Sequence, residues 1–129
     1  KRLQGFCYLC FWVGCAHGQH VRASGGRGFI QVTGRSNYKA LTISWNKKYS
    51  DDPRDFENND SDRDIIVSDV EVGMKLSLLF WDDNGLNEKA DSGINDVSIN
   101  AITKAVNGGY THLEKRKSAT EAFYNELKN

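Results

Sequence analysis

The segment over residues 26–38, GRGFIQVTGRSNY, constrains the fold of this chain more than any other part of its sequence. Its apolar positions, Ile30 and Val32, alternate with the polar positions Gln31 and Thr33. Side chains alternate between the two faces of a strand, and the flanking glycines favour tight turns. The pattern therefore predicts a short strand with a buried apolar face and an outer face that carries an amide and a hydroxyl group.

Apolar periodicity predicts helices over most of the remaining chain, at residues 38–45, about 69–81, 97–106 and 111–127. Ser68 and Glu71 have the spacing of a capping box at a helix start. Thr111 and Glu114 repeat that spacing, and Gly108 is a suitable helix terminator. The predicted fold class is mainly α (α+β), with one short β element.

Length and charge limit the organisation and the partners of the chain. Its 129 residues, 39% of them apolar, suffice for one compact domain. The 17 basic and 17 acidic residues balance, so no net field attracts nucleic acid or an anionic membrane. We therefore expect a monomer whose partner is neither nucleic acid nor membrane.

An acidic stretch follows the first predicted helix and is expected to be a solvated loop. An alternative is a calcium loop, because Asp60, Asp62, Asp64 and Glu71 occupy its first, third, fifth and twelfth places. However, Ile65 stands where such a loop needs a glycine for its sharp bend. The sequence therefore favours the loop without calcium.

Residues 1–25 form an unassigned segment with an apolar, cysteine-rich run at residues 6–16 behind Lys1 and Arg2. Three interpretations stay open: the core of a signal peptide, a short buried helix or strand, and sequence outside the ancestral reading frame. The run is too short to span a bilayer, which needs about 20 residues.

The three cysteines, Cys7, Cys10 and Cys15, all lie in this segment, and an odd number excludes a closed set of internal disulfides. With His17 and His20 they approach the spacing of a zinc knuckle, whose ligands suit tetrahedral zinc. Apolar residues fill the loop that would wrap the ion, and the ligand order is exchanged. We expect no metal site and no cofactor.

The segment at residues 26–38 resembles the GRGxIQL(S/T)xxxNY motif of glycoside hydrolase family 19, which comprises the plant-type chitinases and their bacterial and phage endolysin relatives. Further pieces resemble the FW, LN..AD and NGG...R elements of this family in the same order: Phe80-Trp81, Leu86-Asn87 with Ala90-Asp91, and Asn107-Gly108-Gly109 with Arg116. The resemblance implies that residues 26–129 form the carboxyl-terminal portion of a lysozyme-like helical domain, incomplete at its amino end.

This resemblance implies roles for five polar residues. Gln31 and Asn37 would bind acetamido groups, and Thr33 would help to position the attacking water. Asn107 would line the far wall of the same cleft, with Arg116 behind it. It also implies action on a polymer that contains N-acetylglucosamine, either chitin or peptidoglycan, in an extracellular, periplasmic or phage-lytic setting.

The catalytic pair of the family is not found. Inversion at a sugar carbon needs two carboxyl groups, one to protonate the leaving oxygen and one to activate water. Both family glutamates precede the GRG motif, but no Asp or Glu precedes Gly26, and Gly18 rather than Glu follows His17.

We expect a weak or inactive hydrolase, with Glu57 and Glu71 as the nearest substitutes. The alternative is a non-catalytic descendant that binds acetamido sugar or only folds, and a distant one is a zinc-knuckle-like nucleic-acid binder.

Overall fold

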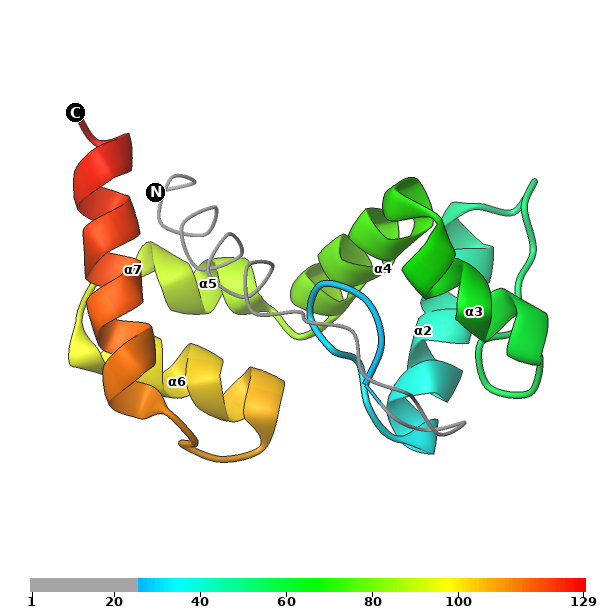
Figure 1. Ribbon diagram of the computed structural model, residues 1–129, viewed down its shortest axis with the longest axis horizontal. Coiled ribbons are helices and arrows are strands. Elements are labelled where there is room, and N and C mark those ends of the chain that lie inside the picture. The colour runs from blue at the N-terminus through cyan, green and yellow to red at the C-terminus, as the bar shows by residue number, and fades with distance from the viewer. Residues whose placement is uncertain (1–25) are drawn as a thin grey trace. The chain divides into compact units, whose positions relative to one another are not determined.

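A computed structural model describes residues 26–129 of the chain, and these residues form a mainly α fold (Figure 1). The helices in this range are α2 (Arg35–Lys48), α3 (Asp60–Ser68), α4 (Val70–Asp83), α5 (Leu86–Asp91), α6 (Asp96–Asn107) and α7 (Leu113–Leu127). They belong to two compact units, residues 26–83 and residues 84–129, each of which is described by itself. The expected mainly α class is confirmed.

In the first unit, α2 and α3 both pack against α4. The helix predicted here from apolar periodicity is confirmed as α4, and its side chains Val72, Leu76, Leu79 and Phe80 are all buried. Burial of such side chains is the main source of stability in a helical unit of this size.

A glycine permits the close approach of α3 to α4. A Cβ atom added at Gly73 would lie 2.7 Å from the carbonyl oxygen of Ile66, and the ring of Phe29 lies beside the same position. Since backbone cannot move as a side chain can, only glycine fits here. Gly73 therefore brings together α3, α4 and the turn that precedes α2.

The acidic stretch differs from the expected solvated loop, because its second half is α3. Asn59 caps this helix, and its side-chain oxygen accepts from the N–H groups of Ser61 and Asp62. The first half is anchored by Phe56, which is fully buried and packs edge-on against Trp45 at 5.4 Å between ring centroids. The acidic composition of this stretch suggested a loop. The signal for a helix was Asn59, because asparagine is a favoured residue at helix starts.

The alternative of a calcium loop is wrong, because three of its proposed ligands, Asp60, Asp62 and Asp64, lie on the regular helix α3. The fourth, Glu71, lies on α4 and pairs with Lys75 at 2.6 Å. A calcium loop instead wraps its ligands around the ion.

The cap of α4 is one residue later than predicted. Asp69, not Ser68, accepts from the N–H groups of Glu71 and Val72, at 2.9 and 3.3 Å. Ser68 ends α3, so its backbone is still helical and cannot adopt the extended conformation of a cap. Glu71 reaches forward to Lys75 instead of back to the cap.

In the second unit, α6 packs against both α5 and α7. The predicted α6 is confirmed, with Asn95 as its cap and Gly108 ending it at a φ of 74°. The capping box predicted at Thr111 is wrong, because α7 follows His112, whose left-handed φ of 56° turns the chain into the helix. Ile99 and Ile102 lie in the core of this unit.

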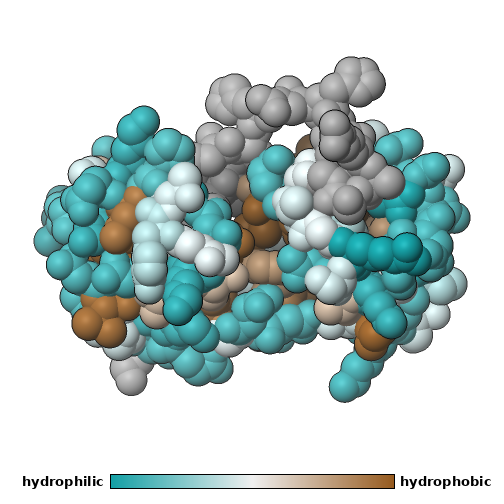
Figure 2. Space-filling view, turned by 90° about the horizontal axis from the view of Figure 1, so that it is seen from below, coloured by the Kyte–Doolittle hydropathy of each residue, from teal (hydrophilic) through white to brown (hydrophobic). Residues whose placement is uncertain are grey.

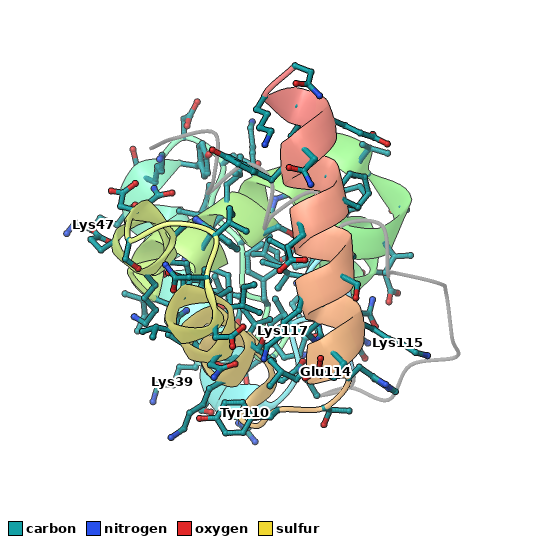
Figure 3. The ribbon with its side chains drawn as sticks, turned by 90° about the vertical axis from the view of Figure 1, so that its left-hand side faces the viewer. Lys39, Lys47, Tyr110, Glu114, Lys115 and Lys117 are labelled. Carbon is teal, nitrogen blue, oxygen red and sulfur yellow. The ribbon has the colours of Figure 1, made fainter. Side chains whose placement is uncertain are left out.

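The carboxylate expected to complete that capping box belongs to a surface ion-pair group. Glu114 and Asp96 both approach the ammonium group of Lys117, at 3.7 and 3.3 Å. Lys117 and Lys115 extend from opposite sides of α7 (Figure 3). The hydrogen bond that Lys117 donates to Asp96 is the main reason that the pKa of Lys117 is raised, and the ion pair with Asp96 ties α6 to α7.

Hydrophilic side chains cover most of the face drawn in Figure 2. Among the helices of residues 26–129, none has the length and apolarity needed to cross a membrane. The interpretations of residues 1–25, including the cysteine and histidine pattern, lie outside the described residues.

Candidate functional site

The candidate site is the turn at residues 26–34, the blue loop that leads into α2 (Figure 1). The strand predicted here is wrong. Arg27 and Val32 instead form a single antiparallel bridge, with N–H to carbonyl distances of 3.1 and 2.9 Å. Gly28 and Gln31 have left-handed φ values of 73° and 57°, which reverse the chain before a strand can extend.

The predicted separation of side chains is confirmed although the strand is not. Ile30 and Val32 are 4% and 3% exposed, whereas Gln31 and Thr33 are exposed. The turn thus keeps the apolar side chains in the core and holds the polar ones at the surface. The unusual φ of Gln31 is a backbone strain of the kind that gathers at functional sites.

A buried polar pair braces the turn from beneath. The Nη1 group of Arg27 donates to the Tyr38 hydroxyl at 3.2 Å, and that hydroxyl donates to the Val32 carbonyl at 2.9 Å. The guanidinium also lies over the Tyr38 ring, 5.7 Å from its centroid. Burial raises the pKa of Tyr38, although the hydrogen bond from Arg27 opposes the change. Both side chains therefore belong to the scaffold of the site.

The three polar side chains of the site donate their hydrogen bonds to the turn itself. Gln31 Nε2 donates to the Gly28 carbonyl at 2.9 Å, and Thr33 Oγ1 donates to the Gln31 carbonyl at 2.8 Å. Asn37 Nδ2 donates to the Thr33 carbonyl at 2.7 Å. Within residues 26–129, the structure pairs no donor with Gln31 Oε1 or Asn37 Oδ1. These bonds fix the side chains and leave acceptor oxygens at an exposed surface.

Gly26 makes room for this arrangement. A Cβ atom at this position would lie 2.7 Å from Gln31 Oε1 and 3.3 Å from Thr33 Oγ1. The nearest of these atoms is the far end of the exposed Gln31 side chain, so a side chain at position 26 would make Gln31 shift rather than clash with backbone. The sequence indicates a turn at this glycine but gives no sign of its closeness to Gln31.

The two glutamates named as substitutes for the catalytic pair are both engaged in ion pairs. Glu57 Oε1 accepts from Arg35 Nε at 3.0 Å, and the Glu57 side chain is 18% exposed. Glu71 forms the exposed pair with Lys75 on α4. Glu57 is the one linked to the site, because its partner Arg35 is the first residue of α2 and directly follows the turn.

Asn107 and Arg116 lie in the second unit. Asn107 is the exposed last residue of α6, and Arg116 is half-buried on α7. The Nε group of Arg116 donates to the Thr111 carbonyl at 3.0 Å, which holds the loop between α6 and α7. The grouping of Asn107 with Gln31 around one groove stays a prediction.

The part of the chain from residue 26 onward contains no group of three His, Cys, Asp or Glu side chains placed to hold a metal ion. Comparison of the chain with models of protein families, with curated proteins and with solved structures gives no match.

Proposed function

We propose that this chain is the carboxyl-terminal portion of a family 19-type glycoside hydrolase domain and binds acetamido-sugar polymer, chitin or peptidoglycan, at the turn that carries Gln31, Thr33 and Asn37. The observation that carries the proposal is the arrangement of these side chains. Their donor groups are held by the turn, and their oxygens stay at the surface. The resemblance of the segment to the family motif names the ligand.

The chemistry of the sugar suits this surface. An N-acetylglucosamine unit offers an amide N–H and several hydroxyl donors, which match exposed amide and hydroxyl acceptors. Side chains already fixed by internal hydrogen bonds lose little conformational entropy when they bind. The scaffold of Arg27 and Tyr38 beneath the turn serves the same end, because it holds the backbone on which Gln31 is placed.

Hydrolysis by this chain alone is expected to be very weak. General acid or base catalysis supplies about 10²–10⁴-fold in rate, and the inverting reaction needs two carboxyl groups on opposite sides of the sugar. Glu57 and Glu71 are each held by a cationic side chain. A binding module without hydrolysis is therefore the second candidate, and it uses the same surface.

Calorimetric titration with N-acetylglucosamine oligomers tests the binding. Gln31→Gly removes the amide and relieves the left-handed φ, so loss of binding cannot be ascribed to new strain. His112→Gly is the matched control, because it relieves a similar φ of 56° in the other unit. We expect Gln31→Gly to weaken binding and His112→Gly to leave it unchanged. Equal affinity of all three proteins would overturn the proposal.

An assay of reducing ends released from chitin oligomers or cell walls separates the two candidates. Release at an ordinary enzymatic rate, abolished by Glu57→Gln or Glu71→Gln, would contradict the expected loss of hydrolysis. Slow release above the background of the sugar alone would favour the hydrolase candidate, and binding with no release at all would favour the non-catalytic candidate.

A further inference from the structure

The chain contains two Asn-Gly dipeptides, Asn84-Gly85 and Asn107-Gly108, in different backbone settings. In such a dipeptide the glycine nitrogen can attack the asparagine side chain, since glycine has no Cβ to hinder it. The first dipeptide lies between α4 and α5, at the boundary of the two compact units. The second lies at the end of α6.

We propose that Asn84-Gly85 is a site of spontaneous deamidation, promoted by the ammonium group of Lys89. Lys89 Nζ donates to the Asn84 carbonyl at 3.2 Å. This carbonyl and the Gly85 N–H belong to one peptide group. A cation at its oxygen withdraws electron density from the nitrogen, which makes the N–H more acidic and its anion more accessible.

The reaction needs only water. The Gly85 N–H gives its proton to base, and the nitrogen forms a bond to Cγ of Asn84. The bond between Cγ and Nδ2 then breaks, and ammonia leaves with the proton returned to it. Water opens the resulting succinimide ring at either carbonyl, which yields aspartate or isoaspartate.

The second dipeptide is held in an unreactive form. The Gly108 N–H donates to the Lys104 carbonyl at 2.8 Å, as part of the end of α6. Its proton is therefore bound, and attack on Asn107 requires the end of the helix to open. Within residues 26–129, the structure pairs the Gly85 N–H with no acceptor.

The product would change the local charge at residue 84, where the second unit begins. Asn84 is exposed and follows Asp82 and Asp83 at the carboxyl end of α4. A new carboxylate there adds to two negative side chains at the negative end of the helix dipole. Isoaspartate would also lengthen the backbone between α4 and α5 by one methylene group.

Peptide mass spectrometry after incubation at mildly alkaline pH tests the proposal on the full chain. We expect Asn84 to deamidate about tenfold faster than Asn107 in the folded protein, the factor that a hydrogen bond to a charged group commonly contributes. In concentrated urea the two rates should converge, because both hydrogen bonds are lost. Equal rates in the folded protein would overturn the proposal.

The role of Lys89 is tested by Lys89→Met, which keeps the aliphatic chain and removes the ammonium group. We expect a slower reaction at Asn84 and no change at Asn107. Lys47→Met, at an exposed position in the last turn of α2, is the matched control and should alter neither rate. An unchanged rate at Asn84 in Lys89→Met would contradict the activation by Lys89.

Discussion

The side-chain amide of Asn46 holds the backbone of Arg54 by two hydrogen bonds. Asn46 Oδ1 accepts from the Arg54 N–H at 2.8 Å, and Asn46 Nδ2 donates to the Arg54 carbonyl at 2.9 Å. Neighbouring positions of α2 extend this attachment, since Trp45 Nε1 donates to the Asp52 carbonyl at 2.8 Å. The acidic stretch is thus fastened to α2 through its backbone, while its carboxylate groups stay exposed or half-buried.

Removal of this attachment should destabilise the first unit. We expect Asn46→Ala to lower the free energy of unfolding by about 1–3 kcal/mol, because two half-buried backbone groups lose their partners. Urea denaturation followed by tryptophan fluorescence measures the change. Lys47→Ala, next along α2 and exposed, is the control and should shift the midpoint little. A similar midpoint for both variants would show that the attachment contributes nothing.

The close contact at Gly73 predicts that alanine at this position destabilises the fold, the opposite of its usual effect in a helix. Alanine in place of glycine inside a helix ordinarily stabilises it by about 1 kcal/mol. Here the added Cβ would lie 2.7 Å from the Ile66 carbonyl oxygen, so α3 and α4 must separate. We expect Gly73→Ala to destabilise by about 1–3 kcal/mol, the usual cost of overpacking.

Gly109→Ala is the control for this substitution, because nothing lies within 4 Å of its added Cβ. Its thermal midpoint should match that of the parent chain. A rise in the midpoint of Gly73→Ala would show that the two helices pack less closely than described.

Because Tyr38 is buried, we expect the free energy of unfolding to fall at alkaline pH. Burial raises its pKa, so the folded chain keeps this proton above about pH 10, where the unfolded chain begins to lose it. The folded state then binds more protons than the unfolded state, and the free energy of unfolding falls as the pH rises from about 10 toward the folded pKa. Below that range this contribution is fully present.

Tyr38→Phe should make the free energy of unfolding less dependent on pH above about pH 10. At neutral pH it should lower that free energy by about 1–2 kcal/mol, because the hydrogen bonds with Arg27 and Val32 are lost. Urea denaturation at a series of pH values measures both effects. Tyr110→Phe, at an exposed position, should keep the slope of the parent chain. Identical slopes for Tyr38→Phe and the parent chain would refute the prediction.

Local patterns predicted the helices well where the signal lay within the helix itself. The start and end of α6 follow from its apolar spacing and from Gly108, both of which act within a few residues. The cap of α4 was misplaced by one residue because Ser68 had already been taken into α3, a helix that the acidic composition concealed. Because α3 was not predicted, the start of α4 was predicted too early.

The candidate site was predictable in its residue types but not in its backbone. Alternation correctly assigned Gln31 to the surface, yet no local rule predicts a left-handed φ at a glutamine. The brace between Arg27 and Tyr38, which holds the turn at Val32, joins residues eleven positions apart and was not predictable from local spacing. The hydrogen bonds that fix Gln31, Thr33 and Asn37 follow from the turn and were therefore missed as well.

Titration of the ¹⁵N-labelled chain with N-acetylglucosamine oligomers, followed by amide chemical shifts, tests the central claim most directly. Cello-oligomers, which have the same linkage but lack acetamido groups, are the matched control. We predict saturable shifts at residues 26–37 with the acetamido oligomer and far smaller ones with the control. No shift in this segment, or equal shifts with both sugars, would contradict the claim that this turn binds acetamido sugar.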